Sequence, residues 1–82
     1  MKLTVLNLKE TLFDGEVQSM TIPAEQGELT ILPNHVPIIT PLKKGAISAL
    51  TLKGGHAAEE RKYIECQSGI LEFADNKATI LL

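Results

Sequence analysis

The chain has 82 residues, of which 44% are hydrophobic and 22% are charged, a composition typical of one small globular domain rather than of a disordered segment. Its formal net charge is −2, and no basic run is longer than two residues, as in Lys43-Lys44. It therefore lacks the electrostatic footprint of a nucleic-acid-binding protein, and one Tyr with two Phe residues is too few for an aromatic platform that stacks bases or sugars.

Hydrophobic and polar residues alternate as in β-strands almost throughout the chain. The alternation changes phase after Val5, between Val17 and Met20, and after Ala49. A change of phase predicts a bulge, or a strand that is buried on one face early and on the other face late. Both are expected where strands bend around the ends of a sandwich or barrel. Cleaner alternation follows at residues 29–31 and 78–82.

Turn-forming sequences separate these runs at intervals of about 8 to 12 residues, the spacing expected of an all-β sandwich. Asp75-Asn76 predicts a tight hairpin, because both residues tolerate a positive φ. Residues 57–62 have a helix-like composition but are too few to nucleate a stable helix, so we expect a polar hairpin loop there. The predicted fold is a two-sheet antiparallel β-sandwich, formed as a single domain over residues 1–82. The other turn sequences are Asp14-Gly15, 23–27, Pro33-Asn34, 43–45, Gly54-Gly55 and 67–69.

The sequence carries no motif of an enzyme or of a cofactor site. Gly54-Gly55-His56 is followed by alanines and carboxylates rather than by the Lys-Ser or Lys-Thr of a phosphate loop. No pair of His or Cys residues has the spacing of metal ligands, and no nucleophile has a local base. Cys66, the only cysteine, excludes an internal disulfide and shares its phase with Ile64, which predicts a buried, inert thiol. We therefore expect no catalytic activity, no cofactor and no metal.

No hydrophobic run approaches the ~20 residues that a helix needs to cross a bilayer. The N-terminal residues 1–6 enter strand-like sequence at once and lack the features of a signal or transit peptide. We therefore expect a bacterial-type cytoplasmic protein.

The segment from Gly27 to Gly45 is the most informative part of the chain. It holds three prolines, which fix φ and remove backbone donors, within an otherwise strongly β-forming sequence. A stiff, irregular segment of this kind is expected to present a surface rather than only to connect two strands.

Residues 27–37, with the sequence G-E-L-T-I-L-P-N-H-V-P, resemble the G-E-L-x-I-L-P-x-H-x-P signature of the epsilon subunit of rotary ATP synthases. The resemblance covers nearly the whole chain, because further segments are similar to the family in the same order and spacing. Asn34 stands where glycine is commoner in the family, and Ser68-Gly69 replaces a glycine pair; Asn tolerates a positive φ, so we expect the turn to be retained. The further segments are 3–6, 12–17, 20–23, 69–73 and 78–81.

The resemblance implies a non-catalytic rotor part of a proton-translocating ATP synthase. In the family, the N-terminal β-sandwich belongs to the central stalk, packs on the gamma subunit, rests on the c-ring and helps to couple proton flow to ATP synthesis. It implies one copy per complex, a monomer in isolation, and a peripheral place on the cytoplasmic face of the bacterial inner membrane. Typical members continue into a C-terminal pair of helices that inhibits hydrolysis and in some members carries ATP. The resemblance here ends at Leu82, so we expect a short form and transfer neither property.

The resemblance also implies roles for individual residues. Glu28 matches an acidic residue that faces the c-ring, and His35 matches a histidine on the gamma-facing side. Asn7 aligns with an early-strand position that is also near gamma. His56 has no counterpart in the family. The residues expected to shape the turns are Gly15, Gly27, Pro33, Pro37 and Gly69.

An alternative is a free-standing β-sandwich adaptor or ligand-binding module outside any rotary motor. Such a module would need a concave aromatic or polar pocket, and the scarcity of aromatic residues counts against it. Gene neighbourhood distinguishes the two hypotheses, because a stalk subunit should be encoded beside the catalytic subunits.

Overall fold

The computed structural model describes residues 1–53 and 58–82, and for residues 52, 53, 58 and 59 only the backbone. Within these ranges the chain forms strands and no helix, so the described residues include no helix that is long and apolar enough to span a membrane. The strands are β1 (Lys2–Leu6), β2 (Thr11–Glu16), β3 (Ser19–Ala24), β4 (Gly27–Ile31), β5 (Ile38–Leu42), β6 (Gly45–Lys53), β7 (Ala58–Cys66), β8 (Gly69–Ala74) and β9 (Lys77–Leu81).

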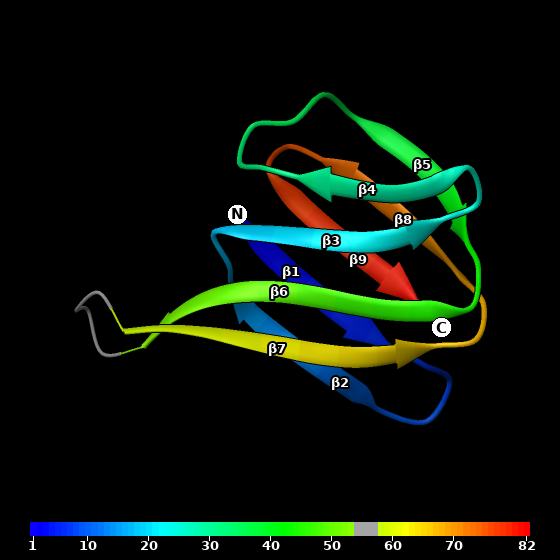
Figure 1. Ribbon diagram of the computed structural model, residues 1–82, viewed down its shortest axis with the longest axis horizontal. Coiled ribbons are helices and arrows are strands. Elements are labelled where there is room, and N and C mark those ends of the chain that lie inside the picture. Colours follow the sequence, from blue (N-terminus) through cyan, green and yellow to red (C-terminus); the bar gives the residue numbers. More distant parts are fainter. Residues whose placement is uncertain (54–57) are drawn as a thin grey trace.

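The strands lie in two layers, as Figure 1 shows. The first sheet has the order β2-β1-β9-β8-β5, and in the second sheet β4, β3, β6 and β7 follow one another. The two sheets meet at a corner where Ala24 of β3 pairs with Leu42 of β5, and the Lys43 amide donates a hydrogen bond of 2.8 Å to the Pro23 carbonyl. The all-β sandwich is confirmed. One pair departs from the antiparallel rule, because β1 and β9 run parallel.

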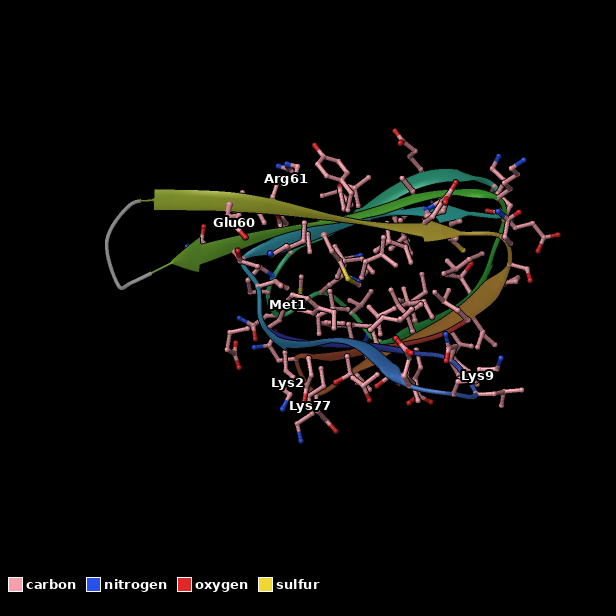
Figure 2. The ribbon with its side chains drawn as sticks, turned by 90° about the horizontal axis from the view of Figure 1, so that it is seen from below. Met1, Lys2, Lys9, Glu60, Arg61 and Lys77 are labelled. Carbon is pink, nitrogen blue, oxygen red and sulfur yellow. The ribbon has the colours of Figure 1, made fainter. Side chains whose placement is uncertain are left out.

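Side chains from the inner faces of both sheets fill the space between the layers (Figure 2). No polar or charged side chain is buried among the residues whose side chains the structure describes. The core therefore rests on dense hydrophobic packing, which gives a small domain its stiffness. The largest fully buried side chains are Phe73, Leu3, Met20, Ile22, Ile31, Ile47, Leu71, Ile80, Val5 and Cys66.

Two of the three phase changes have the predicted causes. The β1–β2 register shifts between Val5 and Leu6, as in a bulge. At Val17 the chain leaves β2 of the first sheet and enters β3 of the second, so the phase changes where the chain turns around the end of the sandwich. After Ala49 the first alternative, a bulge, is absent, because β6 and β7 pair in unbroken register from Gly45 to Lys53.

The tight hairpin is confirmed, since Asp75 and Asn76 adopt φ values of 51° and 59° between β8 and β9. Two turn predictions are wrong. Residues 58–62 belong to β7 and not to a loop, because cross-strand pairing with β6 outweighs their helix-like composition; Ala57 lies outside the described residues. Gly15 lies within β2, opposite Leu3 of β1, and not in a turn.

Gly69 begins β8 at a point where another strand comes close. A Cβ atom there would lie 2.6 Å from the Leu81 carbonyl oxygen, a backbone atom of β9. At Gly15, by contrast, a Cβ atom would make an ordinary contact of 3.6 Å with the Phe13 ring.

We predict that Gly69→Ala lowers the free energy of unfolding by about 1–3 kcal/mol, because the crowded backbone of β9 must shift. Gly15→Ala is the matched control, and we expect it to leave stability unchanged or to raise it by about 0.5–1 kcal/mol. Urea unfolding followed by circular dichroism measures both. Equal effects of the two substitutions would contradict the close approach at Gly69.

Candidate partner-binding surface

The connection between β4 and β5 carries the chain from the second sheet to the first. Its turn is closed by the His35 amide, which donates a hydrogen bond of 3.1 Å to the Leu32 carbonyl. Asn34 adopts a φ of 65°, which is the positive φ expected where glycine is commoner in the family. The Asn34 amide also donates to Asn76 Oδ1 at 2.8 Å, so the β8–β9 hairpin holds this loop in place.

His35 is held by contacts on two sides. Its Nδ1 lies 2.7 Å from the Val36 carbonyl oxygen, and because a carbonyl can only accept, the proton must be on Nδ1. Its ring meets the buried Phe73 ring edge to face, with centroids 6.1 Å apart and an interplanar angle of 89°. The ring therefore extends the core outward to the surface of the loop.

Large apolar side chains around His35 face solvent. Val36 is 69% exposed, Ile39 is 66% exposed and Leu32 is 57% exposed. Apolar groups gathered in this way mark sites of protein contact when they are contiguous. Next to them lies a shallow hollow of about 340 Å³, lined by Pro37, Ile38, Ile39, Glu72, Phe73 and Ala74. We call the residues Leu32, His35, Val36, Pro37 and Ile39 the His35 surface.

Glu28 lies on β4, directly opposite Pro23 of β3, and its side chain is exposed. It makes no hydrogen bond or ion pair with any residue that the structure describes. Gly27, just before it, has a φ of 130°, which only glycine adopts easily, and this directs the chain out of the β3–β4 turn. Glu28 is thus a free carboxylate beside the β3–β4 turn, and it shares a hollow with Ile38 and Thr40 of β5.

Asn7 closes the turn between β1 and β2. Its Oδ1 accepts hydrogen bonds from the Lys9 and Glu10 amides at 2.7 and 2.8 Å. This local capping explains the residue type without any partner. The structure does not bring Asn7 and His35 together. The Lys2 amide donates to the Asn76 carbonyl beside the His35 loop, whereas Asn7 follows the other end of β1.

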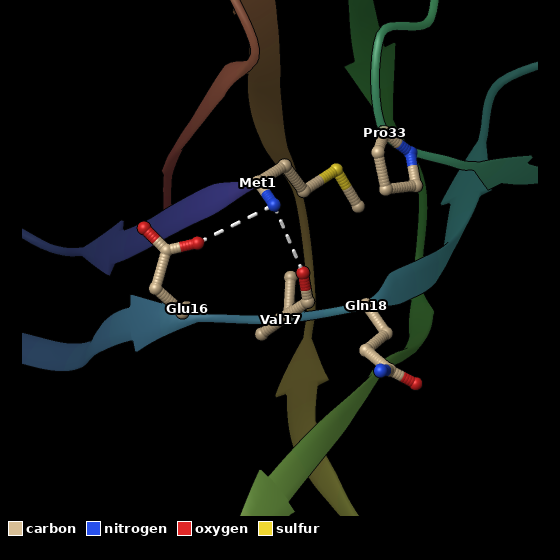
Figure 3. Close-up of a pocket in the computed structure, with 5 residues that line it drawn as sticks. All are labelled: Met1, Glu16, Val17, Gln18 and Pro33. Carbon is tan, nitrogen blue, oxygen red and sulfur yellow. Dashed lines mark hydrogen bonds and ion pairs between the residues drawn. The ribbon is translucent and has the colours of Figure 1, made fainter. Parts of the chain in front are cut away.

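A hollow of about 510 Å³ lies at the N-terminus, and Figure 3 shows the residues that line it. The Met1 ammonium donates to the Val17 carbonyl at 3.1 Å and lies 3.4 Å from Glu16 Oε2. These contacts join β1 to the segment where the chain leaves the first sheet. No pattern in the sequence points to this cluster, because it depends on strand pairing. Pro33 reaches the same hollow, together with Met1, Glu16, Val17 and Gln18.

The described residues offer no group of three or more His, Cys, Asp or Glu side chains that could hold a metal ion. The predicted burial of Cys66 is confirmed, and burial raises the pKa of its thiol. Because a thiol with a raised pKa stays protonated at neutral pH, Cys66 is a poor nucleophile. The described residues thus offer an apolar surface and a free carboxylate on a stiff sandwich. These features are suited to binding another protein.

Comparison with known proteins gives the family. The sequence matches the family described as ATP synthase, Delta/Epsilon chain, beta-sandwich domain over residues 1–82. The chain therefore belongs to this family. Two curated relatives are ATP synthase epsilon chains, from Herminiimonas arsenicoxydans and from Janthinobacterium sp. (strain Marseille). Each is 36% identical over 81 residues, which cover 99% of this chain and 55% of the relative. The chain thus spans about half the length of the curated relatives it matches.

Solved structures show the same fold. A chain in the cryo-EM structure of the Euglena gracilis mitochondrial ATP synthase, OSCP/F1/c-ring in rotational state 1, is similar with a TM-score of 0.80 and 22% identity. The match covers 96% of this chain and 48% of that one. A chain of the Tetrahymena thermophila mitochondrial ATP synthase central stalk and c-ring is similar with a TM-score of 0.75 and 17% identity, covering 98% of this chain and 60% of that one.

We predict that the hydrogen bond from Asn34 to Asn76 limits opening of the His35 loop. Asn76→Gly keeps the positive φ but removes the acceptor, at a cost of about 0.5–1.5 kcal/mol, and should speed exchange of the Asn34 amide proton. Asn76→Asp keeps an acceptor oxygen and is the control, with exchange close to that of the wild type. Hydrogen exchange followed by NMR measures both. Equal protection of Asn34 in the two variants would show that the loop is held by other contacts.

Proposed function

We propose that the chain is a non-catalytic part of the central stalk of a proton-translocating ATP synthase, where it links the gamma subunit to the c-ring. Membership of the Delta/Epsilon family supports the assignment. The observation that carries the docking role is the His35 surface, where three large apolar side chains are more than half exposed on a stiff sandwich. In this proposal the His35 surface packs on gamma and Glu28 faces the polar loops of the c-ring.

The role is mechanical. A rotor part passes torque only if its own deformation is small compared with the movement it transmits. Side chains interdigitated between two hydrogen-bonded sheets supply that rigidity. Glu28 lies near the start of β4, whereas His35 lies in the loop that follows the end of β4, so one rigid body can touch two partners at once. Coupling of proton flow to ATP synthesis then needs no chemistry from this chain.

The proposal includes the setting of the protein. The chain is present as one copy per complex and is a monomer when isolated. It associates with the cytoplasmic face of the bacterial inner membrane only through the complex. Asn7 contributes to the gamma contact through the shape of the β1–β2 turn, because its side-chain oxygen already serves that turn.

The first prediction of this proposal concerns the His35 surface. Val36→Glu should weaken binding to the cognate gamma subunit by about 1.4 kcal/mol or more, a tenfold rise in Kd, because it places a charge in an apolar contact. Tyr63→Glu is the matched control, since Tyr63 is similarly exposed, at 68%, but lies on β7 of the second sheet. Calorimetry with purified gamma measures both. A Val36→Glu protein that binds gamma as tightly as the control would overturn the assignment of this surface.

The second prediction concerns Glu28 and coupling. An exposed ion pair contributes only about 0–1 kcal/mol and weakens with salt, so Glu28→Gln should have a small effect. Glu28→Lys should do more harm, because repulsion replaces a lost attraction. We expect the Lys variant to keep its fold and its gamma binding, and to lower ATP-driven proton pumping relative to ATP hydrolysis.

The measurement is the ratio of pumping to hydrolysis in reconstituted membranes for wild type, Glu28→Gln and Glu28→Lys across a salt series. Raised salt should bring the three ratios together, because it screens the charge. Identical ratios at low salt would remove the support for a c-ring contact at this turn.

A further inference from the structure

Strand β7 leaves one edge of the second sheet open. It pairs with β6 from Ala58 to Cys66, and with no other strand that the structure describes. Figure 1 shows it at the margin of the sheet. Every second residue of such a strand turns its backbone amide and carbonyl away from the sheet. An edge of nine residues is therefore a template on which another strand could pair.

The outward side chains of β7 form a pattern that complements itself. Arg61, Tyr63 and Glu65 alternate with Ile64, which packs on the core, and with the buried Cys66, so the first three share the outer face. If two copies of β7 pair antiparallel about Tyr63, Arg61 of each copy lies opposite Glu65 of the other. The two Tyr63 rings then meet at the centre. One two-fold axis at Tyr63 produces both ion pairs.

Neighbouring registers lack this match. A symmetric pairing centred on Arg61, on Lys62 or on Glu65 would place two like charges opposite each other. A pairing centred on Ile64 would move Arg61 away from Glu65 of the other copy. The charges on the outer face of β7 therefore favour one register over those beside it.

The inner face of β7 carries two charges. Lys62 lies opposite the buried Ala49 and Glu60 lies opposite Thr51, so both side chains are on the inward side of the strand. Figure 2 shows Glu60 and Arg61 on opposite sides of β7. Lys62 Nζ lies 2.7 Å from Glu60 Oε1, and the two side chains are 49% and 32% exposed. We call Lys62 and Glu60 the inward pair.

We propose that the free edge of β7 is a self-complementary surface for a second copy of this chain, and that the inward pair prevents the two copies from pairing. In the register about Tyr63, Lys62 would lie opposite Ile64 of the second copy and Glu60 opposite its Cys66. The second copy would then take water away from both charges and offer apolar side chains in exchange, which is costly. Exposed ion pairs on the outer face return too little to offset that cost.

The charge pattern identifies the occupant. Inward-pointing charges on edge strands oppose pairing with any strand. A second copy of β7, however, necessarily brings Glu65 to Arg61 and Arg61 to Glu65. A strand of another protein would need the same base, aromatic and acid spacing to match the outer face as well. The latent partner is therefore the chain itself, and the inward pair keeps the isolated chain monomeric.

This surface is separate from those of the proposed function. The strand β7 lies at one edge of the second sheet, and Glu28 lies on β4 at the other edge. The His35 surface includes no residue of β7. The proposal therefore does not depend on binding to gamma or to the c-ring, and its test uses the purified chain alone.

Sedimentation equilibrium of the full chain over a concentration series tests the inward pair. Glu60→Val with Lys62→Val removes both charges and introduces residues that favour strands. We expect the dissociation constant of its dimer to be at least about tenfold lower than that of the wild type. Glu60→Lys with Lys62→Glu is the matched control, because it exchanges the two charges and keeps an ion pair. We expect the control to associate no more tightly than the wild type.

Further substitutions in the double Val variant test the register. Adding Glu65→Arg places like charges opposite each other at two positions, so we expect the dimer to dissociate. Adding Arg61→Glu as well restores opposite charges at both positions, and we expect the dimer to return. Raised salt should weaken the dimer, because it screens these exposed pairs.

Circular dichroism checks that each variant keeps its β-fold. If the double Val variant does not fold, Glu60→Gln with Lys62→Met takes its place, since it removes both charges with little change of shape. A folded variant without the two charges that associates no more tightly than the wild type overturns the proposal. So do dimers or larger aggregates that persist after Glu65→Arg, because they do not use the register about Tyr63. Binding of the same variants to gamma is measured separately, so a failure of the proposed function is distinguishable from a failure of this proposal.

Discussion

The two sheets are joined at one backbone corner, and the rest of the fold depends on it. At this corner Ala24 of β3 pairs with Leu42 of β5. On one side the Lys43 amide donates to the Pro23 carbonyl, and on the other the Glu25 amide donates to the Pro41 carbonyl. Backbone groups in a dry interior need partners, so a chain can change sheets only where such bonds are available or where it reaches solvent. Here β3 and β5 share the corner, while β4 pairs with β3 and β5 pairs with β8. The β4–β5 connection must therefore cross between layers at the opposite, open end.

That crossing explains why the His35 surface exists. Proline has no backbone amide donor. The chain can therefore leave the sheet at Pro33 and Pro37 without an unpaired amide at either residue. Two other donors of the loop have partners: the His35 amide donates to the Leu32 carbonyl, and the Asn34 amide donates to the Asn76 side chain of the β8–β9 hairpin. These two hydrogen bonds hold the loop while its large apolar side chains, Leu32 and Val36, face solvent. A stiff and exposed apolar surface follows from the need to change sheets.

The sequence predicts the parts of this structure that depend on near neighbours. Alternation predicted the β-strands, and the Asp75-Asn76 pair predicted a hairpin at two residues that tolerate a positive φ. Residues 58–62 were mispredicted because their helix-like composition is a local property of the sequence, whereas their strand conformation depends on pairing with β6. Gly15 was mispredicted because Asp-Gly is typical of turns, yet β1 pairs with it. The family resemblance selected His35, Glu28 and Asn7, but only the structure shows that Asn7 caps its own turn, at the other end of β1 from His35.

Register also brings together four apolar residues that the sequence does not link, and they form an outer apolar row on the first sheet: Leu6, Leu81, Ile70 and Pro41. Its members come from four strands, β1, β5, β8 and β9, that are far apart in the sequence. Taken singly, an exposed Leu or Ile is common on protein surfaces and has no meaning. The parallel pairing of β1 with β9 is what brings Leu6 beside Leu81 and makes the row continuous. If β9 were shifted by one residue along β1, Leu81 would point into the core and the row would be broken. The buried set Leu3, Val5, Ala78 and Ile80 fixes that register. The same packing that holds the core together therefore also determines which apolar side chains meet on the outside.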